Sequence, residues 1–589
     1  MVFIKFGGYM SKLNVDQKTI KDLFQEKKSD FLIPDYQRPY AWGETECLTL
    51  WEDIFSFAFP NDDYSLFDSD NDEYFLGPIV TFKNEDKKLE IIDGQQRLTT
   101  LMLLLRAFYS KFDNMRDENS RTTREIIERC IWKTDEFGKP KMSELKIDSE
   151  VATDNDKDEF LEILKNGVSK NGNKSRYAQN YQFFQGKIAE FLTNYPSYFS
   201  YLPVRILNNC ILLPIEADNQ DTALRIFSTL NDRGKPLSDA DIFKAQFYKY
   251  YKSINLKNEF IEKWKNLEEL CNRLFTNSSG TPMDELFTRY MYFERAKRGI
   301  SSSTTEALRK FYEKDSYQLL KNQTTLDNLI DLADFWKDVS VQDDVRFSDR
   351  VLRQLYVLNY APNGMWTYFV SVYYLQNRDE NGKLKDDDFY TFLQKVISFV
   401  WAYAITNPGV NALRSPIYSE MINIVNEKPV TFEKYKFDET TVRSLFNTYT
   451  FSNIRPLTKS ILVWWMFQNS NQCLLSLDTS IEVEHIFAKN RQNKEKSLSD
   501  ARKLEQIGNK AILEKRINIR ASDYRFVDKI KYYQGFTNGR NQVKEGTKNA
   551  ELLDLSSAQT DFTEISIDNR NTTILDAFID FIKQNGLMQ

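Results

Sequence analysis

Residues 73–109 carry the pattern that most constrains how this chain folds. Two strand-like runs, EYFLGPIVTFKN and KLEIID, are joined by the polar turn NEDKK, which predicts a β-hairpin. The second run continues into DGQQRLTTLMLLLRAFY, where Leu98, Leu101, Met102 and Leu105 recur at helical spacing. The apolar run NCILLPIEA, residues 209–217, is expected to return as a further strand of the same sheet. The N-terminal part of the chain is therefore predicted to combine a sheet with helices.

Helical patterns follow one another from about residue 250 to residue 470, and they are rich in Tyr, Phe and Trp. Such helices could clamp nucleic acid, but apolar spacing of three and four residues favours packing in a core. No fixed-length repeat is present, so a solenoid is not indicated. A chain of 589 residues predicts two to four domains. The expected fold class is a predominantly helical α+β multidomain protein.

The composition also bears on the compartment of the protein. No run of 18 or more apolar residues is present, and the N-terminus lacks the apolar stretch and cleavage site of a signal peptide. We therefore expect a cytoplasmic protein without a membrane partner. Its five cysteines are scattered and form no CxxC pair, so disulfides and a structural zinc site are not expected.

The DGQQR segment is the first candidate binding site. It consists of Asp93, Gly94, Gln95, Gln96 and Arg97, where a strand, a glycine turn and a helix start coincide. The first turn of a helix leaves backbone N–H groups free and carries a partial positive charge, so it favours anions. Gly94 allows close approach of a ligand, and Arg97 adds a forked donor. The GxxxxGK[ST] pattern of a Walker A loop is absent.

An extended segment with many planar and cationic groups precedes this hairpin. Two prolines, one just before the segment and one within it, favour extended backbone, and the segment displays Tyr36, Gln37, Arg38, Tyr40 and Trp42. These side chains could stack on a base and bind a phosphate. The alternative is that Tyr40 and Trp42 pack against the following helix, which we expect for at least one of them.

A second candidate site surrounds His485, the only histidine in the chain. A neutral imidazole suits the general base that deprotonates water in phosphodiester hydrolysis. Glu484 and Asn518 could supply oxygen ligands to Mg²⁺ or Mn²⁺, and Asn509 could hold the imidazole in the required tautomer. Glu484 and His485 are adjacent, so a regular strand would point them to opposite faces. The alternative is that His485 is an ordinary surface or core residue.

The charge distribution is uneven around this histidine. The whole chain has a net charge of −6, yet residues 485–550 hold 16 Lys and Arg against 7 Asp and Glu, an excess of nine positive charges. A basic surface suits a polyanionic partner such as DNA. A solvated helical face is the alternative interpretation, and charge alone does not separate the two.

Six motifs resemble one family of nucleases. IPDYQRPYAW, IIDGQQRLTTL and RIFSTLNDRGKPLSDADIFKAQF resemble the ParB/sulfiredoxin-like N-terminal domain of GmrSD-type modification-dependent (type IV) restriction endonucleases. EHIF, IGN and INIRASDYRF resemble the C-terminal nuclease domain of that family, a branch of the HNH or His-Me finger nucleases with a ββα-metal fold. One departure is Ala488, where such domains often carry proline. The motifs occur in the family's order at both ends of the chain.

The resemblance implies roles for individual residues. In the N-terminal domain, a nucleotide site would be lined by the DGQQR residues, with Gln37 and Arg38 close by. Asn231 and Asp241 fall on the family pattern, either as functional residues or as caps, and Ser238 is a plausible N-cap for the next helix. In the C-terminal domain, His485 would be the general base and Asn509 would orient it. Asn518 would face the metal together with Glu484.

The resemblance also implies a domain order and a function. We expect a nucleotide-binding sensor domain with a helical insertion at 1–250, a helical linking domain at 251–425 and an HNH-type nuclease domain at 426–589. The expected activity is NTP-regulated, Mg²⁺-dependent cleavage of DNA in bacterial anti-phage defence, with NTPase activity in the N-terminal domain. The target would be modified phage DNA, with glucosylated or otherwise modified cytosine or a phosphorothioate backbone.

Several points stay open at this level. The nucleotide could be ATP, GTP or UTP, and a homodimer is one option for the assembly. One alternative function is a nucleotide-dependent DNA-binding regulator whose nuclease centre is inactive. Another is an abortive-infection nuclease that acts on unmodified DNA or RNA.

Overall fold

A computed structural model describes most of the chain and divides it into two compact units. The described residues are 2–6, 9–27, 29–113, 115–151, 154–169, 174–230, 238–276, 280–300, 302, 306–407 and 413–589. The units are Met1–Lys265 and Asn266–Gln589, and each is considered by itself. Helices predominate and the sheets are small or confined to one unit, so the chain is an α+β multidomain protein as predicted.

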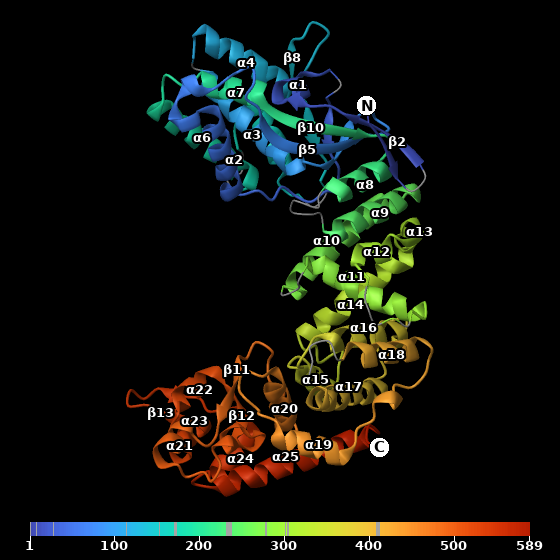
Figure 1. Ribbon diagram of the computed structural model, residues 1–589, viewed down its shortest axis with the longest axis vertical. Coiled ribbons are helices and arrows are strands. Elements are labelled where there is room, and N and C mark those ends of the chain that lie inside the picture. The colour runs from blue at the N-terminus through green and yellow to red at the C-terminus, as the bar shows by residue number, and fades with distance from the viewer. Residues whose placement is uncertain are drawn as a thin grey trace. The chain divides into compact units, whose positions relative to one another are not determined.

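A mixed sheet forms the centre of the N-terminal unit. In the described residues it has eight strands in the order β1-β2-β10-β5-β6-β4-β9, and β3 pairs with β10. Figure 1 shows β5 and β10 side by side within it. The strands are β1 (Val2–Phe6), β2 (Tyr9–Val15), β3 (Lys18–Thr19), β4 (Phe31–Ile33), β5 (Tyr74–Lys83), β6 (Leu89–Asp93), β9 (Ile147–Ser149) and β10 (Cys210–Ala217).

The predicted hairpin and the returning strand are confirmed. β5 and β6 pair antiparallel, and the pair Lys83–Leu89 closes the turn. β10 pairs with β5 in parallel, which places residues 210–217 in the same sheet. β6 ends at Asp93, and Gly94 in the left-handed region (φ 95°) starts the next helix. The sheet therefore delivers the DGQQR segment directly to a helix N-terminus.

Helix α3 (Gln95–Phe112) follows this turn, and its apolar stripe is buried as predicted. It packs against α4 and α6 in the main core of the unit. A short β7–β8 hairpin (Trp132–Thr134, Pro140–Leu145) follows α4. The other helices of the unit are α1 (Ile20–Gln25), α2 (Glu44–Ala58), α4 (Glu118–Ile131), α5 (Lys157–Asn166), α6 (Arg176–Asn194), α7 (Tyr201–Asn209), α8 (Gln220–Leu230) and α9 (Asp239–Ser253), with α10 (Lys257–Leu274) crossing into the next unit.

The first half of the C-terminal unit is helical, and its aromatic side chains form the core. Trp336, Trp366, Trp401 and Tyr290 are all buried, so core packing rather than a nucleic-acid clamp accounts for them. The helices are α11 (Pro282–Lys297), α12 (Leu308–Tyr312), α13 (Lys314–Tyr317), α14 (Gln323–Ser340), α15 (Asp349–Leu358), α16 (Met365–Asn377), α17 (Asp386–Thr406), α18 (Arg414–Val425), α19 (Glu439–Thr448) and α20 (Pro456–Met466).

The last part of the chain surrounds a two-stranded antiparallel sheet of β11 (Ile481–His485) and β12 (Lys510–Glu514). Helix α22 (Lys515–Ala521) follows β12 directly and contacts both strands, so two strands and one helix pack together, with α21 and two 3-10 helices in the connection between the strands. The remaining elements are α21 (Lys489–Glu495), the 3-10 helices η6 (Ala501–Glu505) and η7 (Ile507–Asn509), α23 (Phe526–Gln534), the hairpin β13–β14 (Phe536–Thr537, Val543–Lys544), α24 (Ala550–Ala558) and α25 (Glu564–Gln584).

The final helix, α25, docks on this region. Arg570 on α25 donates from Nη1 to the carbonyl oxygens of Ile507, Gly508 and Lys510. These contacts fix the turn that precedes β12. Among the described residues, no helix combines the length and the apolar composition needed to cross a membrane.

Candidate functional site

His485 lies at the end of strand β11, directly opposite Lys510, the first residue of β12. Because side chains alternate along a strand, Glu484 and His485 point to different faces. Their contacts agree: Glu484 bonds to residues of α23, whereas His485 bonds to Lys510, Glu505 and Asn453. The strand therefore separates the two neighbouring residues that the sequence suggested for one site.

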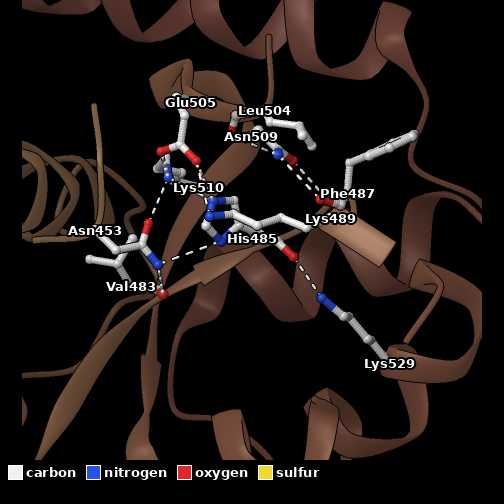
Figure 2. Close-up of polar contacts among 10 residues, drawn as sticks. All are labelled: Asn453, Val483, His485, Phe487, Lys489, Leu504, Glu505, Asn509, Lys510 and Lys529. Atoms are coloured by element: carbon white, nitrogen blue, oxygen red, sulfur yellow. Dashed lines mark hydrogen bonds and ion pairs between the residues drawn. The ribbon is translucent and has the colours of Figure 1, made fainter. Parts of the chain in front are cut away.

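The imidazole of His485 lies within a compact polar cluster (Figure 2). Its Nε2 is 2.8 Å from Lys510 Nζ and 3.3 Å from Glu505 Oε1, and its Nδ1 is 3.5 Å from Asn453 Nδ2. Lys510 Nζ also donates to Glu505 Oε2 at 2.8 Å and to Asn453 Oδ1 at 2.6 Å. The three hydrogens of this ammonium group thus have three acceptors, one of which is the histidine ring.

Burial and charge set the protonation state of this cluster. Burial, together with Lys510 and Lys489, lowers the pKa of His485 to about 4, so the imidazole is neutral near neutral pH. Burial also lowers the pKa of Lys510 to about 8, against the effect of Glu505. Burial acts to raise the pKa of Glu505, but the hydrogen bonds from Lys510 and Lys489 and the charge of Lys510 together outweigh it, and the pKa is lowered. A neutral imidazole is the form that can accept a proton.

Asn509 is fully buried and clamps the backbone just after His485 (Figure 2). Its Oδ1 accepts from the backbone N–H of Phe487 at 2.7 Å, and its Nδ2 donates to the carbonyl oxygens of Phe487 and Leu504, each at 3.2 Å. Ile486 N–H donates to the carbonyl oxygen of Asn509 at 2.9 Å. These bonds act on the main chain, so Asn509 positions His485 through the backbone and not through the ring.

The two predicted metal ligands are held in separate contacts. Glu484 Oε1 accepts from Lys529 Nζ at 2.6 Å and from Tyr533 Oη at 2.7 Å, and burial raises the pKa of this carboxyl despite Lys529. Asn518 Nδ2 donates to Glu482 Oε2 at 2.8 Å. In the described parts of the chain, no cluster of three or more His, Cys, Asp or Glu side chains could hold a metal ion. As arranged here, Lys529 stands where a cation would bind Glu484, so these residues do not form a ready metal site.

In the N-terminal unit, the glutamines of the candidate anion site tie the extended segment to the sheet. Gln95 donates to Gln37 Oε1 at 3.0 Å, and Gln37 donates to the carbonyl oxygens of β6 residues Ile91 and Ile92. Gln96 accepts from the Ala41 N–H at 2.7 Å and donates to the Pro39 carbonyl oxygen at 3.1 Å. These amide hydrogen bonds hold the extended segment against the N-terminus of α3.

The charged residues at this helix N-terminus have fewer hydrogen-bond partners than the glutamines. Arg97 donates from Nη1 to the Pro78 carbonyl oxygen at 2.9 Å. Burial raises the pKa of Asp93, against the effects of Arg97 and Arg38. Arg38 Nε is buried and has no hydrogen-bond partner among the described residues. A buried guanidinium donor without an acceptor, beside a helix N-terminus, is a favourable place for an anion.

Tyr36, Tyr40 and Trp42 have structural contacts. Tyr36 donates to Glu90 Oε1 at 2.6 Å. Tyr40 shares a hydrogen bond with Thr100 and stacks on Tyr177 at a centroid distance of 4.8 Å. Trp42 is half-buried against the main core. Tyr40 also interacts with Cys47 of α2, the helix that follows the segment, as expected for at least one of Tyr40 and Trp42.

The third N-terminal motif is described only in part. Ser238 caps α9, because its Oγ accepts from the Asp241 N–H at 3.2 Å, while Asp241 Oδ2 accepts from the Ser238 hydroxyl at 2.8 Å. Asp241 therefore serves as a cap in this structure, and the predicted N-cap is confirmed. Asn231 lies outside the described residues.

Two family models match the chain, and together they cover more than half of it. The model for the GmrSD restriction endonuclease N-terminal domain matches residues 20–248, and the model for the C-terminal domain of the same enzymes matches residues 436–577. The chain belongs to the GmrSD family. A comparison with curated proteins found no match.

Both candidate sites of this GmrSD-type protein fall inside the matched ranges. The α3 N-terminus lies within the N-terminal match, and the His485 cluster lies within the C-terminal match. Membership in a restriction endonuclease family supports a restriction-type nuclease whose partner is DNA. The matches leave residues 249–435 outside both family domains.

The sequence did not indicate five residues of this GmrSD-type protein that contact His485 or Glu484. They are Asn453, Glu505, Lys510, Lys529 and Tyr533. Lys510 carried a signal, because it is a charged residue at the start of the apolar strand run KAIL. Asn453 and Lys529 lie 32 and 45 positions from their partners in β11, and no local pattern joins them.

Proposed function

We propose that this GmrSD-type protein is a DNA endonuclease of anti-phage defence, with its HNH-type nuclease centre at His485. The observation that carries the proposal is the position of the only histidine. It ends the first of two strands that pack with helix α22, is held neutral by burial and two lysines, and is braced from behind by Asn509. A His-Me finger fold for this unit is consistent with two strands and one helix packed together.

In this mechanism, His485 takes a proton from the attacking water, and nearby cations offset the charge that develops on the phosphate. Asn509 keeps the turn after β11 in place, which fixes where the imidazole points. Mg²⁺ or Mn²⁺ is the expected cofactor and, when bound, would polarise the phosphate oxygens. A metal ligated by Glu484 and Asn518 would have to displace Lys529, so metal dependence is itself a point to be measured.

Cationic side chains of the same unit support DNA as the substrate. A cavity of about 470 Å³ lies beside α22, at the end of the β11–β12 sheet away from His485. Its lining includes four cationic side chains, Lys515, Arg516, Arg520 and Lys548, and the carboxylates of Asp478, Glu514 and Glu545. Cationic side chains that line a groove can follow a phosphate backbone and release counterions when DNA binds. We therefore place the duplex across α22 and the exposed edge of the His485 cluster.

For the N-terminal unit we propose a ParB/sulfiredoxin-like nucleotide-binding domain that controls cleavage. Its phosphate site would be the first turn of α3, with Arg38 and Arg97 as the cationic groups. The buried, unsatisfied Nε of Arg38 supports this position. Arg38→Ala should lose binding and hydrolysis of ATP, GTP or UTP, whichever the wild type uses. Unchanged turnover in this variant would remove the site from the proposal.

The nuclease proposal is tested on one plasmid prepared in unmodified, glucosyl-hydroxymethylcytosine and phosphorothioate forms. Wild type and His485→Ala are compared with Mg²⁺, with and without each NTP. We expect one modified form to be cut, and the cutting to be lost in His485→Ala. Cutting of unmodified DNA or of RNA would favour an abortive-infection nuclease instead.

A nucleotide-dependent DNA-binding regulator is the second candidate, and one observation favours it. Both predicted catalytic groups are occupied: Lys510 donates to the His485 ring, and Lys529 neutralises Glu484. A regulator would bind NTP and DNA without cutting any form of the plasmid, and His485→Ala would not change its binding.

A further inference from the structure

Three nitrogen groups in the nuclease unit converge on one carboxylate, that of Glu505 (Figure 2). Lys510 Nζ lies 2.8 Å from Oε2, while Lys489 Nζ and His485 Nε2 lie 3.2 and 3.3 Å from Oε1. A carboxylate with one negative charge and two oxygens is therefore shared by two ammonium groups, and the ring nitrogen of the predicted general base lies beside it.

A phosphodiester has the same formal charge as this carboxylate and also presents two non-bridging oxygens. Lysine ammonium groups bind phosphate as point charges, and charge-assisted hydrogen bonds are stronger than neutral ones. A scissile phosphate must also lie close to the base that activates the attacking water. The place now filled by the Glu505 carboxylate satisfies both requirements.

We propose that Glu505 occupies the position of the scissile phosphate in the DNA-free protein, and that Lys510 and Lys489 bind that phosphate when Glu505 moves aside. This inference rests on the proposed nuclease function. It assigns two phosphate-binding residues and one competing carboxylate, none of which belongs to the six sequence motifs.

The burial of Lys510, Glu505 and Lys489 is consistent with replacement of the Glu505 carboxylate by a phosphate. Lys510 is fully buried, whereas the side chains of Glu505 and Lys489 are 26% and 50% exposed. Glu505 is the last residue of the short 3-10 helix η6, and its partial exposure shows that its side chain reaches solvent. If it turns outward, Lys510 keeps Asn453 Oδ1 as an acceptor at 2.6 Å, and the incoming phosphate replaces the lost negative charge.

The first test measures binding of a short DNA duplex by fluorescence anisotropy at several salt concentrations, in EDTA so that no cleavage occurs. Glu505→Gln should bind more tightly than wild type, on the order of tenfold, because a like charge no longer competes with the phosphate. The slope of log K against log salt should stay close to that of wild type, because both proteins contact the same phosphates once Glu505 has moved aside.

Glu564→Gln is the matched control, because Glu564 is 23% exposed, accepts from Lys503 at 2.8 Å and lies in the same unit. It removes the same charge and should have only a small effect. If Glu505→Gln binds DNA no more tightly than Glu564→Gln, the proposal is wrong.

Lys489 gives a second test, which leaves the ion pair between Lys510 and Glu505 unchanged. Lys489→Ala should weaken DNA binding and reduce the salt slope by about 0.9, whereas Lys494→Ala, an exposed lysine on the same helix α21, should do neither. Equal effects of the two changes would overturn the proposal, even if Glu505→Gln fails to fold.

Failure of the nuclease function and failure of the phosphate site give different experimental results. If wild type cuts no DNA but Glu505→Gln binds more tightly, the nuclease function is wrong and the phosphate site stands. If wild type cuts DNA and His485→Ala does not, while both binding tests show no difference from their controls, the nuclease function stands and the phosphate site is wrong.

Discussion

The buried ion pair behind the candidate site gives the sharpest prediction on stability. Lys529 and Glu484 have side chains that are 1% and 5% exposed, and their charged atoms are 2.6 Å apart. Lys529 Nζ also donates to the His485 carbonyl oxygen at 2.6 Å, and Tyr533 donates to the same carboxylate oxygen at 2.7 Å. The perturbation is Lys529→Met, which keeps the apolar part of the side chain and removes the charged ammonium group.

The expected loss in the free energy of unfolding comes from the buried groups that lose Lys529 as a partner. Without Lys529, the carboxylate of Glu484 stays buried with Tyr533 as its remaining side-chain donor, and the carbonyl oxygen of His485 loses a hydrogen bond. Breaking a buried ion pair by removing one partner costs about 3–5 kcal/mol. The double variant Lys529→Met with Glu484→Gln should recover much of this loss, because no charge is then left unpaired.

Urea unfolding followed by fluorescence and circular dichroism measures the change in the free energy of unfolding. Lys531→Met on the same helix α23 is the control, since Lys531 is exposed and should cost no more than about 0.5 kcal/mol. A cost below about 1 kcal/mol for Lys529→Met would refute the ion-pair reasoning. No recovery in the double variant would contradict it as well.

The same variant tests the predicted metal site. If Glu484 is a metal ligand, Mg²⁺ should stabilise Lys529→Met more than wild type, because no ammonium group has to be displaced. At 100 times its dissociation constant, a ligand adds about 2.7 kcal/mol to the free energy of unfolding. Equal stabilisation of the two proteins would remove Glu484 from the metal proposal.

Three further changes test other contacts. Asn509→Ala should lower the free energy of unfolding by about 1–3 kcal/mol, because the buried N–H of Phe487 loses its acceptor, and an unchanged urea midpoint would contradict this. Gly508→Ala should lower the free energy of unfolding by about 1–3 kcal/mol, since the added Cβ would lie 2.3 Å from the Ile567 carbonyl oxygen. Thermal unfolding measures this loss, and an unchanged stability would show that α25 can shift without cost. Arg38→Ala should weaken nucleotide binding in calorimetry by about tenfold or more, the worth of a charge-assisted hydrogen bond, and equal affinity would exclude Arg38 from the site.

The sequence predicted those parts of the fold whose signals are local. The β5–β6 hairpin and α3 follow from alternation, a polar turn and an apolar stripe that lie within 40 residues of one another. The helices between 250 and 470 follow from the same kind of apolar spacing. The cap formed by Ser238 was also readable from a short motif.

The contacts of the candidate site could not be predicted in the same way, because they depend on tertiary pairing. The sequence indicated His485 but not the residues around it, since Lys510 reaches the ring only through the register of β11 and β12. It placed Glu484 beside His485, and strand alternation then directed the two side chains to different partners. Burial of Lys529 against Glu484 depends on how α23 packs, which no spacing rule gives.

The most direct test of the central claim is single-turnover cleavage of a DNA substrate that wild type cuts, using His485→Ala with and without added imidazole. The account predicts that the variant is inactive, that free imidazole restores part of the cleavage rate, and that DNA binding is unchanged throughout. Full cleavage by His485→Ala without imidazole would show that this histidine is not the general base.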